Sequence, residues 1–256
     1  MKRIRIIPVL QLKGEGLYKT VKFRKPRYVG DPINAVKIFN EKEVDELAFI
    51  DIEASIKNKE PNYNKIEEIA SECFMPLAYG GGINNIKQVN KIFSIGVEKI
   101  IINTSSYTNP KLIEQTAKIY GSQSVVISID FKKDIFKTNR PYIKSGTQKI
   151  KQKLHLWAKN VENYGAGEIL LTSINRDGTY SGYDLDTIND ISQSVNIPVI
   201  ANGGASGIED MAKAVINNHA SACAAGSLFI FASSNRGVLI NYPTQEELKE
   251  KIFIKL

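Results

Sequence analysis

The chain has 256 residues, of which 43% are hydrophobic, and its formal net charge is +7. That hydrophobic share is enough for a buried core, and no apolar run approaches the ~20 residues that a membrane-spanning helix needs. The only cysteines, Cys73 and Cys223, show neither metal-ligand spacing nor a disulfide framework. We therefore expect a reduced, cytoplasmic protein that uses no metal and no cofactor.

The positive charge does not by itself indicate nucleic acid. We expect the lysines to be spread along helices, and not to cluster with aromatic residues as they do in nucleic-acid-binding surfaces. We expect a solvated basic surface, with at most a modest role in attracting an anionic small substrate. Neither nucleic acid nor a membrane is expected as a partner. His155 and His219 lack ligand-like neighbours, and they are predicted to be structural, as is Trp157.

Apolar runs typical of β-strands begin near residues 4, 46, 75, 98, 124, 167, 197 and 221, with helical patterns between them. The first helix should have Asp31 as its N-cap and Pro32 at its first position, where a missing N–H costs nothing. Later helices should begin at Asn109-Pro110 and near Asp184. Strands that alternate with helices pair in parallel, because each return crossover contains a helix.

This order and the length, close to the about 250 residues typical of such barrels, predict an α/β fold. We expect one (β/α)8 TIM barrel that occupies residues 1–256 as a single domain. An open doubly wound sheet is the alternative, but it seldom shows a twofold repeat of four strand-helix units.

The chain shows such a repeat. Tyr79-Gly80-Gly81-Gly82 is echoed by Ala201-Asn202-Gly203-Gly204, so that Gly82 lies 122 residues before Gly204. Each cluster follows a short apolar run and precedes an amphipathic segment. The spacing predicts two half-barrels, of about residues 1–122 and 123–256.

Active sites of these barrels lie at the carboxyl ends of the strands. Asp130 ends the fifth predicted strand, and it is a candidate general acid or base, with a purely structural hydrogen bond as the alternative. Its mate in the repeat is Gln11, which cannot exchange a proton at neutral pH. Lys19 lies in the segment 12–30, which is too long for an ordinary connection and is predicted to close over the site.

Two sets of glycine, hydroxyl and amide residues, one in each half, are predicted to bind phosphate through convergent donors. The first set is Gly81, Gly82, Asn103 and Thr104, and the second is Thr172, Asp177, Gly178, Asn202, Gly203, Gly204, Gly226 and Ser227. Two such sites suggest an elongated small molecule that is phosphorylated at both ends. The alternative is that the glycines only permit tight turns.

Four charged residues lie near the starts of predicted strands, where apolar packing is expected: Arg5, Glu46, Lys99 and Glu168. On spacing alone, ordinary surface salt bridges are the favoured interpretation. A closed, mutually neutralising ring of two acids and two bases is the alternative prediction.

Several motifs resemble the cyclase subunit of imidazole glycerol phosphate synthase, almost from end to end. They include Tyr79-Gly80-Gly81-Gly82, Gly167-Glu168-Ile169-Leu170-Leu171-Thr172-Ser173 and Arg176-Asp177-Gly178-Thr179. The resemblance implies a barrel that receives ammonia from a glutaminase subunit docked on its N-terminal face. It also implies that the four charged residues gate an ammonia tunnel, that Lys19 and Asp130 act in catalysis, and that the glycine sets bind the substrate's phosphates.

The sequence departs from that family at Gln11, where the histidine-pathway enzymes carry a catalytic Asp. Pro8-Val9-Leu10-Gln11-Leu12-Lys13 and Cys73-Phe74-Met75-Pro76 instead resemble a paralogue group associated with acetamidino modification of surface-polysaccharide sugars. That resemblance implies a glutaminase and a separate sugar amidotransferase as partners. Two alternatives stay open: a true cyclase of histidine biosynthesis, and a noncatalytic scaffold that binds and activates a glutaminase.

Overall fold

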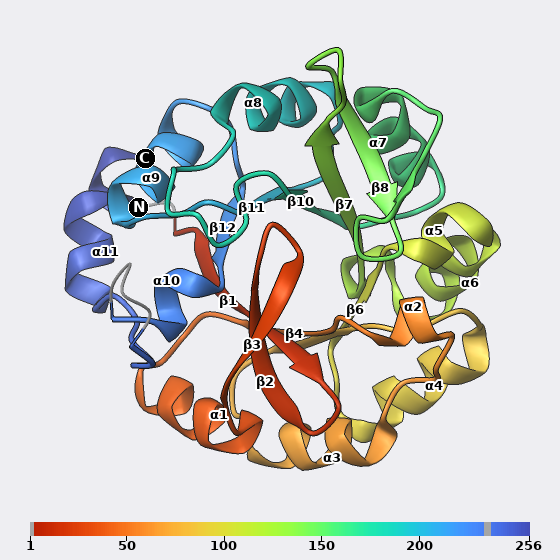
Figure 1. The fold of residues 1–256 in the computed structure, drawn as a ribbon, viewed down its shortest axis with the longest axis horizontal. Helices are drawn as coiled ribbons and strands as arrows, with labels where there is room; N and C mark the ends of the chain where they lie inside the picture. Colours follow the sequence, from red (N-terminus) through yellow and green to blue (C-terminus); the bar gives the residue numbers. More distant parts are fainter. Residues whose placement is uncertain (1–2, 233–236) are drawn as a thin grey trace.

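A closed barrel of eight parallel strands forms the centre of the molecule, in a computed structural model that describes residues 3–232 and 237–256. Around the barrel the strands are β1 (Arg5–Lys13), β4 (Leu47–Asp51), β5 (Leu77–Gly80), β6 (Lys99–Ile102), β7 (Val125–Lys133), β10 (Glu168–Ser173), β11 (Val199–Asn202) and β12 (Ala222–Ala225). β12 pairs with β1 and β7 pairs with β10, which closes the ring (Figure 1). Each strand begins within about two residues of its predicted start, and the predicted (β/α)8 barrel is confirmed.

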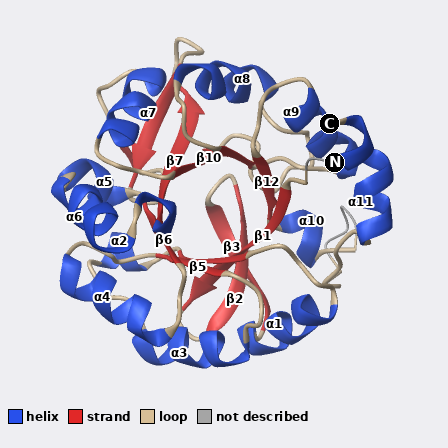
Figure 2. Cartoon of the chain, turned by 180° about the vertical axis from the view of Figure 1, so that it is seen from behind, coloured by secondary structure: helices blue, strands red, loops and turns tan. Residues whose placement is uncertain are grey.

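Helices surround the strands (Figure 2). The longer ones are α1 (Pro32–Glu41), α3 (Tyr63–Glu72), α4 (Ile86–Ile95), α6 (Lys111–Tyr120), α7 (Leu154–Asn163), α8 (Leu185–Ser194), α9 (Ile208–Ile216) and α11 (Gln245–Lys251). The short helices α2 (Ala54–Lys57), α5 (Thr104–Thr108) and α10 (Ser227–Ile230) follow strand ends, and η1 (Ser122–Ser124) and η2 (Phe253–Lys255) are 3-10 turns. None of the described helices combines the length and apolar character that crossing a membrane requires.

Local sequence explains where these helices start. The Asp31 side chain accepts a hydrogen bond from the N–H of Asn34, which confirms the predicted N-cap. The Asp184 side chain accepts one from the N–H of Thr187, and the predicted helix start near Asp184 is confirmed. α6 begins at Lys111, one residue after the predicted Asn109-Pro110 start. Trp157 is 3% exposed on α7 and packs in the core, as predicted.

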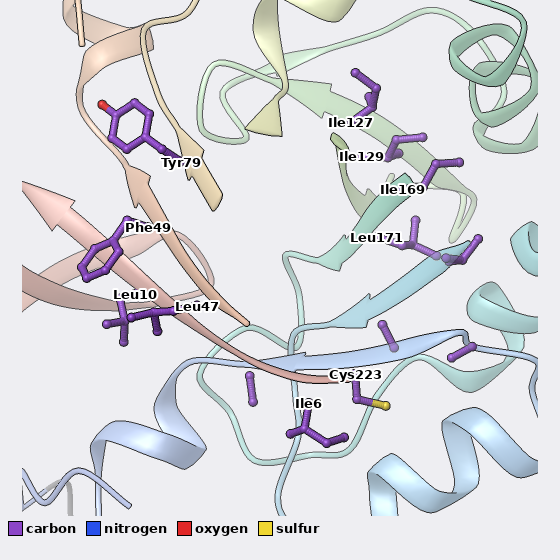
Figure 3. Close-up of a cluster of buried hydrophobic side chains, with 14 of the residues drawn as sticks. Ile6, Leu10, Leu47, Phe49, Tyr79, Ile127, Ile129, Ile169, Leu171 and Cys223 are labelled. Carbon is purple, nitrogen blue, oxygen red and sulfur yellow. The ribbon is translucent and has the colours of Figure 1, made fainter. Parts of the chain in front are cut away.

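Side chains of the barrel strands alternate between the interior and the helix layer. The interior layer is small and apolar: Ile7, Val9, Ala48, Ala78, Ile101, Val126, Leu170, Ile200, Ala222 and Ala224. Their neighbours in sequence, such as Ile6, Phe49 and Ile127, pack in the larger cluster beneath the helices (Figure 3). The barrel is thus filled in its middle, and polar groups gather only at its two ends.

Two antiparallel hairpins extend barrel strands at the carboxyl end. β2 (Gly16–Val21) and β3 (Arg24–Gly30) continue β1, whereas β8 (Asn139–Ile143) and β9 (Gln148–Lys149) continue β7. In Figure 1 the β2–β3 hairpin lies over the centre of the barrel, and the β7–β8 hairpin stands at its rim. The segment 12–30, expected as a long connection that closes over the site, is therefore a paired hairpin, because β1 runs past the barrel and supplies β2 with a partner.

The two glycine clusters make the same close contact in each half. Gly81 (φ +126°) and Gly203 (φ +88°) have backbone conformations that L side chains rarely adopt. A Cβ atom at Gly81 would lie 2.9 Å from the carbonyl oxygen of Asp51, and one at Gly203 would lie 2.7 Å from that of Ser173. Asp51 and Ser173 are separated by the same 122 residues as the two glycines. The turns therefore require these glycines sterically, whatever the loops bind.

The packing of α1 gives a test of the fold. Phe39 is fully buried on α1, so Phe39→Ala should lower the free energy of unfolding by about 3–5 kcal/mol, through lost burial and a cavity. Phe74 is 85% exposed, so the matched Phe74→Ala should change it by no more than about 0.5 kcal/mol. Urea denaturation measures both values, and equal losses would contradict this packing.

Candidate functional site

A cavity of about 280 Å³ opens at the carboxyl ends of the barrel strands. Phe23 and Pro26 of the β2–β3 hairpin contribute to its wall. The predicted site residues in its lining are Gln11, Lys19, Gly81, Gly82, Asn103, Thr104, Asp130, Thr172, Asp177, Asn202 and Gly226. The parallel sheet explains this gathering, because the carboxyl ends of all eight strands meet at one rim.

Four members of the second predicted phosphate set do not line the cavity: Gly178, Gly203, Gly204 and Ser227. The hairpin covers part of this set. A Cβ atom at Gly178 would lie 2.6 Å from the carbonyl oxygen of Thr20, and the N–H of Lys22 donates to the carbonyl oxygen of Asp177 at 2.9 Å. The structure thus brings the first set into the cavity but leaves the second set only partly open to it.

Asp130 lies at the end of the barrel part of β7 and is 7% exposed. Burial raises the pKa of its carboxyl group to about 7, and the nearby charge of Asp177 adds to the rise. Hydrogen bonds from the hydroxyls of Ser128, at 2.9 Å, and of Thr172 oppose it. Near neutral pH both protonation states are populated, so this carboxyl can donate or accept a proton.

Gln11 holds the hairpin. Its Oε1 accepts hydrogen bonds from the backbone N–H of Thr20 at 3.0 Å and from the Thr20 hydroxyl at 3.1 Å. The same hydroxyl lies 3.1 Å from Oδ2 of Asp177. Because Gln11 lines the cavity and uses its oxygen for the hairpin, its amide nitrogen is the group left to meet a ligand. Gln11 therefore offers a hydrogen-bond donor and no proton-transfer group.

Lys19 and Asp177 form a buried ion pair between the hairpin and the barrel. Nζ of Lys19 lies 2.7 Å from Oδ1 of Asp177, and the two side chains are only 4% and 9% exposed. A Cβ atom at Gly226 would lie 2.9 Å from Cε of Lys19, so the lysine stem packs on that glycine. The pair fixes the hairpin over the second half of the barrel and places a cation at the cavity wall.

Asn103 and Thr104 mainly hold the other hairpin. Nδ2 of Asn103 donates to the carbonyl oxygens of Ser128, at 3.0 Å, and of Tyr142, at 3.2 Å. The Thr104 hydroxyl accepts from the N–H of Lys144 at 3.1 Å. Both donors of the Asn103 amide are thus used within the protein, which leaves the backbone at Gly81 and Gly82 as the better part of the first predicted phosphate set.

Asp51 is a site residue that was not predicted from the sequence. It ends β4, lines the cavity, and accepts hydrogen bonds at Oδ1 from the N–H groups of Glu53, at 2.9 Å, and Ala54, at 3.1 Å. Burial raises the pKa of this carboxyl group. Its signal was the one used for Asp130: a carboxylate at the end of an apolar strand. In the described part of the chain, no three His, Cys, Asp or Glu side chains are placed to hold a metal ion.

At the opposite end of the barrel, the four charged residues close the predicted ring. Arg5 contacts Glu46 and Glu168 at 2.5 Å each, and Lys99 contacts Glu46 at 2.8 Å and Glu168 at 3.1 Å. Burial alone would lower the pKa of Arg5, but the hydrogen bonds and charges of the two glutamates outweigh it and raise that pKa. These partly buried, doubly shared contacts are not ordinary surface pairs.

Comparison with known proteins agrees with this architecture. A model of the histidine biosynthesis protein family matches residues 5–235. The chain is 50% identical over 248 residues to the "Putative imidazole glycerol phosphate synthase subunit hisF2" of Pseudomonas aeruginosa, covering 97% of this chain and 99% of that protein. It is 49% identical to a similarly named HisF of Leptospira borgpetersenii, over 99% of this chain and 100% of that protein.

A relative without the word "putative" in its name is more distant. The imidazole glycerol phosphate synthase subunit HisF of Alkaliphilus metalliredigens is 41% identical over 225 residues, which is 88% of this chain and 89% of that protein. The family match spans most of the chain, and the identities extend over nearly the full length of each relative. The chain therefore belongs to the histidine biosynthesis protein family, among the barrels that resemble HisF.

Proposed function

We propose that this chain is an ammonia-using synthase subunit of the HisF type, which serves acetamidino modification of an amino sugar of a surface polysaccharide. A glutaminase subunit on the N-terminal face supplies the ammonia, and a sugar amidotransferase is the acceptor enzyme. Asp130 is the acid or base of the site, Lys19 is its cation, and the glycine sets bind a phosphorylated small molecule.

The observation that carries this proposal is the role of Gln11. An amide oxygen that accepts two hydrogen bonds from Thr20 serves to hold the hairpin and cannot take up a proton. Of the two matched positions 11 and 130, only the second then carries a proton-transfer group. Loss of one general acid or base costs on the order of 10² to 10⁴ in rate, so chemistry that needs two opposed carboxylates is disfavoured.

The two ends of the barrel support the use of ammonia. The ring of Arg5, Glu46, Lys99 and Glu168 covers the N-terminal end, and the cavity with Asp130 opens at the other. Between them lies the small apolar layer that includes Ala48, Ala78, Ala222 and Ala224. An ion that entered this layer would lose its hydration at a large cost in free energy, whereas the cost for neutral ammonia would be much smaller. In this proposal the ring is the gate that admits it.

A genuine cyclase of histidine biosynthesis is the second candidate. The similarity to the Alkaliphilus HisF favours it, as does the pKa of Asp130 near 7, which suits one carboxyl to both proton roles. The same buried carboxyl argues against an inert scaffold that only activates a glutaminase, since a scaffold has no use for it.

The cyclase assay separates the first two readings. The chain, its glutaminase and glutamine should give no imidazole glycerol phosphate at an ordinary enzymatic rate from the histidine-pathway intermediate, because the second carboxylate is missing. The Alkaliphilus HisF with its own glutaminase is the positive control. Ordinary turnover by this chain would reject the polysaccharide reading. Under the cyclase reading, Gln11→Asp should raise the turnover by about 10² to 10⁴, and no gain would count against it.

Asp130 gives a test by pH. Its folded pKa of about 7 lies above the ordinary value of 3.8, so the folded protein binds this proton more tightly than the unfolded chain. The contribution of Asp130 to the free energy of unfolding should therefore fall as the pH rises from about 4 to 7, by on the order of 1 kcal/mol per pH unit. Asp130→Asn should remove this slope in urea titrations. The same slope in both proteins would show that Asp130 titrates normally.

The ring gives a test by isotope transfer. Glu168→Gln leaves Arg5 and Lys99 to share Glu46 as their one carboxylate partner among the described residues, so the ring should lose its closed form. Transfer of amide nitrogen-15 from glutamine to the amidine product should fall by about tenfold relative to transfer from added ammonium. Glu209→Gln, which removes the exposed pair with Lys251, is the matched control and should keep the wild-type ratio. An unchanged ratio in Glu168→Gln would remove the gate from the proposal.

A further inference from the structure

The positive charge of the chain is concentrated on the two hairpins that frame the cavity. Residues 22–27 and 132–144 hold nine basic side chains and one acidic one, Asp134, which exceeds the net excess of the whole chain, +7. The expectation that the lysines spread along helices is therefore wrong for this surface. We call these nine residues the basic collar: Lys22, Arg24, Lys25, Arg27, Lys132, Lys133, Lys137, Arg140 and Lys144.

In the part of the chain that the structure describes, few of the positive charges of the collar are neutralised by carboxylates. Within residues 3–232 and 237–256, the collar residues form one ion pair with a carboxylate. It joins Nε of Arg140 to Oδ2 of Asp134, at 3.3 Å. The hairpins also touch, since a Cβ atom at Gly146 would lie 3.3 Å from the ring of Phe23. Lys132 is held in place there by its 3.0 Å hydrogen bond to the carbonyl oxygen of Gly146. Lys132 and Arg24, which lie on different hairpins, are thus close enough to repel each other, and among the described residues the collar forms one ion pair with a carboxylate.

The pKa of Lys132 is lowered by burial and by this crowding of positive charge. Burial lowers the pKa of its ammonium group, and the charge of Arg24 on the other hairpin lowers it further. Repulsion between the hairpins is relieved when an anionic surface covers both. The charge is therefore suited to a ligand that spans the hairpins.

An apolar tip stands beside the collar. Ile135 and Phe136, at the turn between β7 and β8, are 89% and 80% exposed. The Asp134 side chain accepts hydrogen bonds from the N–H groups of Phe136, at 2.9 Å, and Thr138, at 3.0 Å, so the turn is held in one shape. An exposed apolar anchor with charged surroundings is typical of protein interfaces. Neither Ile135 nor Phe136 lines the cavity, so a small molecule held there would not meet this tip.

We propose that the basic collar and the Ile135-Phe136 tip form the docking surface for an acidic partner protein, the enzyme that consumes what leaves the cavity. This inference rests on the proposed function, in which that enzyme is the sugar amidotransferase. Docking over the mouth places it at the end of the barrel opposite the charged ring, so it and the glutaminase bind without competing. A covered mouth also keeps water from the transferred ammonia, which would otherwise be protonated and lose its nucleophilic lone pair.

The experiment measures binding of the purified sugar amidotransferase to the complex of this chain with its glutaminase, as a function of salt. Lys22→Glu/Arg24→Glu/Arg27→Glu should raise the Kd at least about tenfold and flatten its salt dependence. Ile135→Ser/Phe136→Ser should raise the Kd but keep the wild-type salt dependence. The matched control, Lys87→Glu/Lys111→Glu/Lys118→Glu on the exposed surfaces of α4 and α6, should bind as the wild type does.

The inference is overturned by no binding of the wild type, or by equal binding of the collar variant and the helix control. Tighter binding of a DNA duplex of about 20 base pairs than of the amidotransferase would do so as well, and would assign the collar to nucleic acid. Nitrogen-15 transfer from glutamine is measured in the same mixtures. Transfer without collar-dependent binding rejects the docking surface alone, whereas collar-dependent binding without transfer rejects the proposed function and leaves the surface standing.

Discussion

Both polar ends of this molecule depend on the ladder between β7 and β10, which closes the sheet. Six residue pairs join the strands, from Glu168 beside Val126 to Ser173 beside Phe131. In that register β10 contributes a carboxylate to the charged ring at its start and sets Thr172 beside Asp130 near its end. A slip of one residue would turn both side chains toward the helix layer, because the side-chain period of a strand is two.

The barrel interior separates the two ends chemically. One end holds four charges in mutual contact, the other holds a carboxyl with a pKa near 7, and the apolar cluster that includes Ile7, Ala48 and Leu170 lies between them. Such a layer allows the ends to differ in charge without neutralising one another. It also keeps the low dielectric that raises the pKa of Asp130, since that rise comes mainly from burial.

Local patterns in the sequence were sufficient for the barrel and for part of the site. Strand starts and the caps at Asp31 and Asp184 depend on neighbouring residues, and Asp130 is conspicuous as the one charge in its apolar run. The hairpins were not predictable in this way, because β2 exists only where β1 runs past the barrel rim. The hydrogen bond from Asn103 to the carbonyl oxygen of Tyr142 depends in the same way on β7, which also runs past the rim and pairs with β8. The basic collar depends on both hairpins.

The covering of the second glycine set has the same origin. Gly178 lies beneath Thr20, 158 residues earlier in the chain, and no local pattern indicates that contact. Gly81 and Gly203 illustrate the opposite case. Their backbone contacts repeat at the offset of the sequence, so the duplication predicts one from the other, although it does not predict which half stays open.

The buried pair of Lys19 and Asp177 has a consequence for any phosphorylated ligand. Both groups are almost fully enclosed, so pulling them apart would strand two unpaired charges in a poor solvent for ions. A phosphate that replaced Asp177 beside Lys19 would give the ammonium a new anion, but the buried carboxylate of Asp177 would still lose its cation. Asp177 would keep its hydrogen bonds to the hairpin, from the Thr20 hydroxyl and from the N–H of Lys22. An anionic ligand at Lys19 would therefore exchange one counter-ion without releasing the hairpin.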